Sequence, residues 1–268
     1  MVSSRTVGGC RNRVAAQTTT GSSADAAPAE IATPVRLGLL GGFRLTIDSE
    51  NVPLPMNAQR LISFLALHEQ PLLRPFVSGS LWGDSTEHRA GGSLRSVLWR
   101  LHHPTYPLIA LTSEHIALSP TVAVDLREGA ALAHRVLDPS RELDDVSAVN
   151  EDVLAADLLP DWSEDWVLTE RDRYRQLRLR ALEALCRRLA AKGRFGQAVQ
   201  AGLAAVSGEP LRESARSALI EAHLAEHNVA AARREYDAFR QLLRDELGVE
   251  PSEQLRALID RGPVANRP

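Results

Sequence analysis

The hydrophobic positions between Thr86 and His103 recur at the spacing of an amphipathic helix. At 100° per residue they form one apolar stripe, made of Leu94, Val97, Leu98 and Leu101. The opposite arc has no acidic residue and consists of Arg89, Gly92, Arg95, Ser96, Trp99, Arg100 and His103. Such a helix fits a DNA major groove, and it equally fits a protein surface with a solvated basic face.

The segment before this helix contains short apolar runs separated by turn residues. Residues 35–54 are rich in β-forming residues and predict a small antiparallel sheet. Asn57 is expected to cap the next helix, whose apolar positions extend to His68 and which Pro71 ends. A shorter helix is expected to begin at Arg74-Pro75.

The segments on either side of the 86–103 helix complete a recognisable order of elements. Asp84 and Glu87 have the spacing of a capping box, with Asp in place of the usual Ser or Thr. Residues 108–119 form two alternating apolar runs around Ser113-Glu114, which predicts a β-hairpin. The order of sheet, three helices and hairpin matches a winged helix-turn-helix, in which the third helix contacts DNA and the hairpin is the wing.

The chain after Asp125 has a helical pattern almost throughout. Asp125 is expected to cap a helix that runs to Leu137, and residues 144–154 form a second helical segment. A long helix is predicted from about 163 to 191, since its apolar residues recur every three or four positions. Near its start, Trp162 and Trp166 are expected to fill the junction between the two halves of the chain.

The last part of the chain contains an internal repeat. Three positions recur 34 residues later, since Phe195, Ala198 and Gly202 correspond to Val229, Ala232 and Tyr236. Thirty-four residues is the tetratricopeptide period, with one helix-turn-helix in each unit. An ordinary α-helical bundle is the alternative.

The composition agrees with a mainly α-helical fold with a small β component. Hydrophobic residues make up 44% of the chain and aromatic residues only 4%. We expect a winged helix-turn-helix domain at residues 35–120, followed by an all-α, tetratricopeptide-like domain at residues 121–268. Residues 1–34 are rich in Ser, Thr, Ala and Gly and predict a disordered tail.

Charge and motifs exclude several classes of function. The net charge is −3, and residues 35–120 hold seven arginines against six acidic residues, so DNA affinity has to come from a local patch. Cys10 and Cys186 lack the spacing of metal ligands, and no catalytic or phosphate-binding motif occurs. We therefore expect no enzyme, no metal and no cofactor. No apolar run is long enough to cross a membrane, so a cytoplasmic protein without a membrane partner is expected.

Several motifs in this order resemble the small members of the Streptomyces antibiotic regulatory protein family. They are VRLGLLGGFRL at 35–45, LWGD at 81–84, SLRSVLWRL at 93–101, LLPDWSEDWV at 158–167 and DELGVEPSEQL at 245–255. The resemblance covers about residues 35–260. It implies a winged helix-turn-helix followed by a bacterial transcriptional activation domain.

The resemblance also implies a function and partners. Such a protein would activate transcription of an antibiotic or other secondary-metabolite gene cluster, binding direct repeats in double-stranded DNA as a dimer. It would recruit the RNA polymerase holoenzyme and act at the nucleoid. The chain departs from the family pattern at the wing turn, which has SEHI where Gly-Tyr is common, and at Gly91-Gly92 in the third helix.

The site residues that we expect fall into three groups. Base contacts are assigned to the middle and one edge of the cationic arc, namely Gly92, Arg95, Ser96 and Trp99. Phosphate contacts are assigned to the rest of the arc and to the wing, namely Arg89, Arg100, Thr112, Ser113 and His115. In similar proteins the loop between the second and third helices can face RNA polymerase; here it comprises Gly83, Asp84, Ser85, Thr86, Glu87 and His88.

Each of these residues also has a simpler interpretation. Arg95 and Ser96 could be ordinary surface residues, and the side chain of Trp99 could fold back onto Tyr106 or the wing. A second function therefore stays open, that of a tetratricopeptide-like protein-interaction module with weak or lost DNA binding. The low net charge of residues 35–120 and the Gly91-Gly92 pair favour that alternative.

Overall fold

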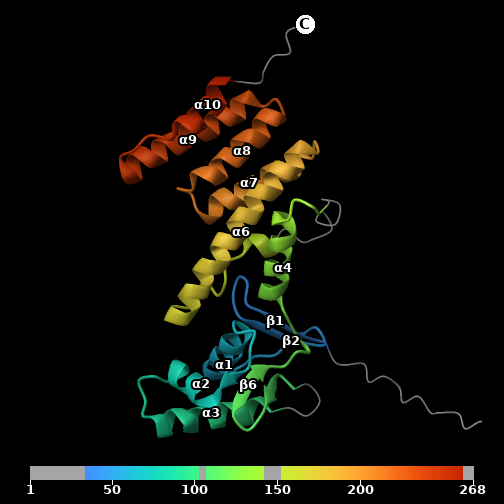
Figure 1. The fold of residues 1–268 in the computed structure, drawn as a ribbon, viewed down its shortest axis with the longest axis vertical. Helices are drawn as coiled ribbons and strands as arrows, with labels where there is room; N and C mark the ends of the chain where they lie inside the picture. The colour runs from blue at the N-terminus through green and yellow to red at the C-terminus, as the bar shows by residue number, and fades with distance from the viewer. Residues whose placement is uncertain (1–33, 103–106, 142–151, 262–268) are drawn as a thin grey trace, which may run out of the picture. The chain divides into compact units, whose positions relative to one another are not determined.

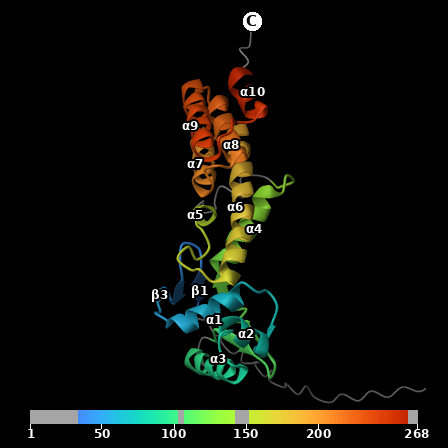
Figure 2. The ribbon, with the colours of Figure 1, turned by 90° about the vertical axis from the view of Figure 1, so that its left-hand side faces the viewer.

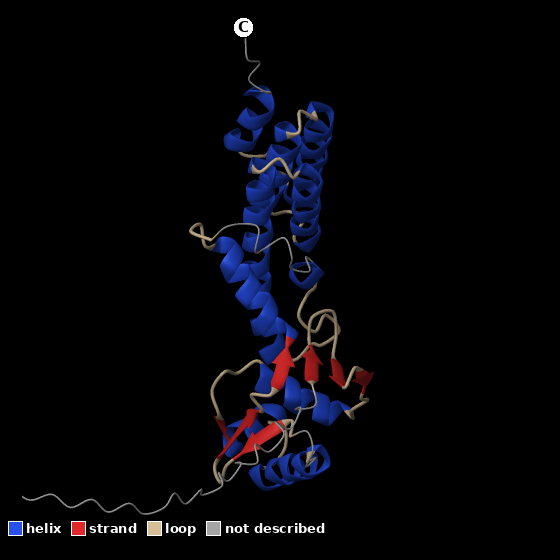
Figure 3. Cartoon of the chain, turned by 90° about the vertical axis from the view of Figure 1, so that its right-hand side faces the viewer, coloured by secondary structure: helices blue, strands red, loops and turns tan. Residues whose placement is uncertain are grey.

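The computed structural model describes residues 34–102, 107–141 and 152–261. The expected fold class is confirmed, because a small β-containing N-terminal half precedes a half made of helices (Figures 1 and 3). The tail at 1–33, His103, Tyr106 and residues 144–151 lie outside the described residues. No helix in the described ranges is long and apolar enough to span a lipid bilayer.

The N-terminal sheet has four strands in the order β3-β2-β1-β7. Strands β1 (Val35–Gly38), β2 (Arg44–Ile47) and β3 (Glu50–Asn51) are antiparallel, as the apolar runs predict. Strand β7 (Val122–Val124) pairs with β1 in parallel, and the sequence pattern did not reveal it. Three residues directly after a hairpin give no periodic signal, so only the partner strand 85 or more residues earlier defines β7.

Three helices follow the sheet: α1 (Met56–Ala66), α2 (Arg74–Leu81) and α3 (Glu87–Leu101). The prediction that Asn57 caps α1 is wrong, because the Pro55 carbonyl already accepts the N–H groups of Ala58 and Gln59 and the first turn closes there. The helix ends at Ala66, well before Pro71, and His68 lies beyond its end. There its Nδ1 lies 2.7 Å from the Phe64 carbonyl oxygen.

The predicted hairpin is present and forms part of a second sheet. Strands β5 (Ile109–Leu111) and β6 (His115–Leu118) are antiparallel, and β4 (Leu72–Leu73) pairs with the other side of β6. Strand β4 directly precedes α2, so the wing is hydrogen-bonded to the start of the second helix. The Arg74 N–H also donates to the Glu114 carbonyl at 2.9 Å.

The C-terminal half consists of α4 (Asp125–Leu137), α5 (Asp152–Ala155), α6 (Asp165–Ala191), α7 (Phe195–Gly208), α8 (Glu213–Ala225), α9 (Val229–Leu247) and α10 (Glu253–Arg261). Phe195 and Val229 are the first residues of α7 and α9, so the 34-residue period corresponds to two successive helix pairs. Ala198 and Ala232 are both fully buried. At Gly202, a Cβ atom would lie 3.0 Å from Leu219, which explains the small residue at that crossing.

Asp125 does not cap α4, contrary to the sequence prediction. The N-cap is Val124, and the Asp125 carboxylate accepts hydrogen bonds from the N–H groups of Leu39 and Leu40 at 2.8 to 3.1 Å. Burial raises the pKa of Asp125, against the lowering effect of these backbone hydrogen bonds. The first residue of α4 is therefore bonded to the segment that connects β1 and β2.

A second connection joins the same segment to the chain just before α6. Leu40 and Leu158 form an antiparallel bridge, flanked by hydrogen bonds from the N–H of Gly41 to the Asp157 carbonyl (2.8 Å) and from the N–H of Leu159 to the Leu39 carbonyl (2.9 Å). Leu159 has a φ of 41°, which a non-glycine residue rarely adopts. Side-chain contacts from α6 hold this loop in place.

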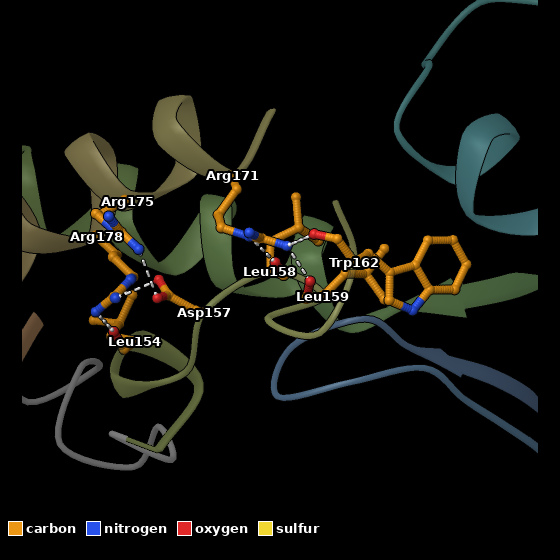
Figure 4. A network of polar contacts seen from close by, with 8 residues as sticks. All are labelled: Leu154, Asp157, Leu158, Leu159, Trp162, Arg171, Arg175 and Arg178. Carbon is orange, nitrogen blue, oxygen red and sulfur yellow. Dashed lines mark hydrogen bonds and ion pairs between the residues drawn. The ribbon is translucent and has the colours of Figure 1, made fainter. Parts of the chain in front are cut away.

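Arginines on α6 hold the 154–162 loop (Figure 4). Arg171 donates to the carbonyls of Leu158, Leu159 and Trp162. Arg175 and Arg178 both donate to the carboxylate of Asp157, at 2.9 and 2.5 Å. Partial burial raises the pKa of Asp157, but the hydrogen bonds from the two guanidinium groups outweigh it and leave that pKa lowered.

The two tryptophans of the LLPDWSEDWV motif fill the junction, as predicted. Trp162 stacks on Phe43 at 6.4 Å between ring centroids, and Trp166 meets Phe64 of α1 edge-on at 5.2 Å. Arg60 of α1 adds an ion pair with Glu164 at 3.0 Å. The core of the N-terminal half thus continues into residues from the start of α6.

We expect Arg171→Met to lower the free energy of unfolding by about 2–3 kcal/mol, because three loop carbonyls lose their donor. Urea denaturation followed by tryptophan fluorescence measures the change. Arg173→Met is the matched control, since Arg173 is exposed and pairs only with Glu170 on its own helix, so its loss should cost less than about 0.5 kcal/mol. Equal effects of the two substitutions would contradict the role assigned to Arg171.

The lowered pKa of Asp157 predicts a pH dependence. A carboxylate whose pKa is lowered by folding adds stability above its unfolded pKa of about 3.9 and loses that stability as the pH falls through the folded pKa. Asp157→Asn should therefore be clearly less stable than the wild type at pH 7, and the difference should shrink below about pH 4. A difference that stays constant from pH 7 to pH 3, in urea titrations, would show that the charge has no part in it.

Candidate nucleic-acid interface

Helix α3 has one buried and one exposed face, as its sequence predicts. Its buried side chains are Ala90, Leu94, Val97, Leu98 and Leu101. Helix α3 packs against α1 and α2, below which it lies in Figure 2. The opposite face is solvent-exposed and includes Arg89, Arg95, Ser96, Trp99 and Arg100. None of these side chains lies beneath another part of the described protein, so the face is free to meet a large ligand.

The start of α3 differs from the predicted capping box. Thr86 is the N-cap, with extended backbone angles, and its side chain makes no capping hydrogen bond. Asp84 lies in the preceding turn, two residues before the N-cap. Glu87 is instead the first residue of the helix, where its negative charge is favourable towards the helix dipole.

The residues between α2 and α3 are exposed, but they do not form the loop that was expected. Gly83, Asp84, Ser85 and Thr86 form a turn in which the Ser85 N–H donates to the Trp82 carbonyl at 3.0 Å. Glu87 and His88 belong to the first turn of α3. The loop is thus two residues shorter at its C-terminal end than the sequence predicted.

The Arg95 guanidinium group lies beside Gly91 and Gly92, at distances where an added Cβ atom would make ordinary van der Waals contact. A Cβ atom built at Gly91 would lie 3.6 Å from Arg95 Nη1, and one at Gly92 would lie 3.8 Å from Arg95 Nη2. The guanidinium group therefore lies back over the first turns of α3. Each glycine costs about 1 kcal/mol in a helix interior relative to alanine. The helix is therefore locally weakened at the turn over which the Arg95 guanidinium group lies.

A groove of about 590 Å³ runs beside this part of α3 and is open to solvent. Its walls come from the start of α2 and the start of α3, and its charged or polar side chains are Arg74, Ser78, Glu87, His88 and Arg95. Arg74 thus lies in the same groove as Arg95, although the sequence pattern did not indicate that it belongs to the site. The available signal was its place directly before Pro75 at a helix start, at the end of the helix that faces α3.

Ser96 is exposed, but its hydroxyl is already used. Its Oγ donates to the Gly92 carbonyl at 3.0 Å, four residues earlier in the same helix. The hydroxyl proton is therefore satisfied inside α3, and only the oxygen lone pairs face outwards. The structure favours close approach at Ser96 over hydrogen-bond donation from it.

The wing residues differ in what they offer. Thr112 Oγ1 accepts the His115 N–H at 2.9 Å, and the Thr112 N–H donates to the His115 carbonyl at 2.9 Å, so Thr112 closes the turn. Ser113 is exposed at the tip, next to the exposed Glu114, and His115 is half-buried. Thr112 and Ser113 are thus both exposed, but the Thr112 hydroxyl already closes the turn.

The Trp99 side chain is 80% exposed, which makes it the most exposed large hydrophobic residue of the described chain. It does not fold back onto the wing, and the other expected partner, Tyr106, lies outside the described residues. The four residues of the apolar stripe, by contrast, are each less than 10% exposed. Trp99 therefore contributes nothing to the core that the rest of α3 builds.

Comparisons with known proteins agree with this architecture. Residues 125–261 match the family model of the bacterial transcriptional activator domain. The chain is 29% identical over 253 residues to the regulatory protein AfsR of Streptomyces coelicolor. The aligned region covers 85% of this chain but only 24% of that relative. The fold is similar to that of Mycobacterium tuberculosis EmbR in complex with a low-affinity phosphopeptide. The TM-score is 0.62 at 22% identity, over 88% of this chain and 66% of that chain.

We expect Gly92→Ala to stabilise the chain by about 0.5–1 kcal/mol, because alanine is the better helix former and its Cβ meets only the end of the Arg95 side chain. The same change should weaken binding to duplex DNA, since it adds a methyl group to the centre of the exposed face. Thermal or urea unfolding measures the first effect and a mobility-shift titration the second. Gly196→Ala, at an open position in α7, is the control and should leave DNA affinity unchanged.

Proposed function

This chain belongs to the Streptomyces antibiotic regulatory protein family of transcriptional activators, as its motifs predicted, and we propose that it binds double-stranded DNA through α3. The observation that carries the proposal is the exposed face of this helix. Three arginines and a tryptophan lie on that face without an acidic residue among them, and a continuous apolar stripe fixes the helix from behind.

The exposed face offers the two kinds of contact that sequence-specific binding needs. Arg95 has a planar fork that can bind the O6 and N7 atoms of guanine, and Gly92 and Ser96 allow the backbone to approach the base edges. Contacts to phosphate groups position a protein on DNA without specifying sequence. The residues suited to such contacts are Arg74, Arg89, Arg100, Ser113 and His115. Thr112 would contribute through its backbone, since its hydroxyl closes the turn.

Family membership supports a more detailed proposal. The protein would bind direct repeats near promoters of a secondary-metabolite cluster as a dimer and recruit the RNA polymerase holoenzyme, with the 83–88 segment facing the polymerase. Few cations lie on one α3 helix, so a single protomer should bind modestly. Two protomers on adjacent repeats gain affinity through effective concentration, which gives the dimer a physical reason.

Substitution of Arg95 and Arg100 tests the assignment. Arg95→Ala should cost about 1–3 kcal/mol of binding and relax the preference at one base position. Arg100→Ala should weaken binding to all sequences alike and reduce the slope of log affinity against log salt by about one. Mobility-shift titrations at several salt concentrations, on the upstream region of the neighbouring gene cluster, measure both effects.

Arg180→Ala is a control, because Arg180 is exposed in the middle of α6 and lies outside the proposed interface. If neither Arg95→Ala nor Arg100→Ala changes the affinity, α3 is not the DNA-binding helix. If the wild-type chain binds no duplex DNA at all, the chain is better described as a tetratricopeptide-like interaction module.

A further inference from the structure

The exposure of Trp99 has no explanation in the fold. Burial of a large apolar side chain contributes about 1.5–3 kcal/mol, so a tryptophan left 80% exposed forgoes a large stabilisation. Its sequence neighbours Val97, Leu98 and Leu101 are buried, and the exposed side of the helix could have carried any polar residue. An apolar side chain at such a position points to an apolar group on a partner.

The position of Trp99 on α3 narrows the kind of partner. Trp99 is three residues after Ser96 and seven after Gly92, so all three share one line along the middle of the exposed face. Arg95 lies on one side of this line and Arg89 and Arg100 on the other. The middle of the face therefore bears small residues followed by one large aromatic ring, between two cationic edges.

The one hydroxyl group among these three residues already donates a hydrogen bond within α3. Gly92 has no side chain, and the Ser96 hydroxyl donates to the Gly92 carbonyl at 3.0 Å. Ser96 can still accept a hydrogen bond and the Trp99 indole N–H can still donate one. The remainder of this line offers shape and apolar contact for base discrimination, and further hydrogen-bond donors come from the arginines at its edges. The apolar group that duplex DNA displays in the major groove is the C5 methyl group of thymine.

We propose that Trp99 is a specificity-determining residue that packs its indole ring against the C5 methyl group of a thymine. The proposal rests on the proposed function, that α3 lies in the major groove. Gly92 and Ser96 allow the helix to come close to the bases, and the guanidinium groups on either side engage the flanking guanines or phosphates. Trp99 thereby adds the preference for thymine over cytosine or uracil at one position of each repeat.

Replacement of thymine by deoxyuridine tests this directly, because it removes the methyl group and keeps every base-pair hydrogen bond. A binding site is first obtained with the full chain by in vitro selection, and each thymine is then replaced in turn. For the wild type, one substitution per repeat should weaken binding about four-fold, the effect of one buried methyl-sized group. For Trp99→Ala, the thymine and deoxyuridine sites should bind equally, with an unchanged salt slope.

A matched control is Met56→Ala, which removes another exposed apolar side chain. Met56 is 59% exposed at the start of α1, and its replacement should leave the four-fold preference intact.

If no thymine replacement affects the wild type while Arg95→Ala still weakens binding, the thymine contact is wrong and the proposed function stands. The same conclusion follows if Trp99→Ala keeps the preference, or if it impairs transcription without changing DNA affinity, since Trp99 would then contact a protein. If the wild type selects no sequence, the proposed function itself fails.

Discussion

The structure depends on how the backbone of residues 39–41 is hydrogen-bonded, because two distant segments share it. The Asp125 carboxylate accepts hydrogen bonds from the N–H groups of Leu39 and Leu40. In a short antiparallel bridge, the chain at 157–159 bonds to the Leu39 carbonyl and the Gly41 N–H. Buried backbone groups left without partners would each cost a free energy similar to that of a lost hydrogen bond. The sheet beside the three-helix unit is therefore bound to the starts of both α4 and α6, and the halves cannot separate without exposing several unpaired groups.

Two carboxylates at this junction behave differently because their partners differ. Burial raises the pKa of Asp125, which meets only backbone N–H groups, whereas the Arg175 and Arg178 guanidinium groups keep the pKa of Asp157 lowered despite its partial burial. The ionised form of Asp157 thus stabilises the fold, while ionisation of Asp125 opposes it. The junction is therefore held by charged hydrogen bonds at Asp157 and by backbone hydrogen bonds at Asp125.

The sequence allowed prediction of what local periodicity determines. The helix pattern of 86–103, the hairpin at 108–119 and the 34-residue period all correspond to observed elements, because each follows from residues close together in the chain. Strand β7 and the role of Asp125 could not be predicted in this way, since their partners lie some 85 residues away. Capping at Asn57 and Asp84 was predicted wrongly, because the N-cap residues of the two helices are Pro55 and Thr86. At the candidate site, the arc was predictable, but the place of Arg74 in the groove was missed because it depends on how α2 packs beside α3. The bond from the Ser96 hydroxyl to Gly92 is local, and the helical spacing of the two residues was its available signal.

Two features of α3 that disagree with helix stability, Gly92 and Trp99, lie on the exposed face. Gly92 weakens the helix and Trp99 stays in water, whereas Leu94, Val97, Leu98 and Leu101 on the opposite face are buried. Random drift would place unfavourable residues around the whole circumference, and a merely solvated surface would place lysines, glutamates or alanines there at no cost. Departures from local rules on an exposed face are typical of a face shaped by a ligand. In α7, by contrast, the small residues Ala198 and Gly202 are explained by helix–helix contacts inside the protein.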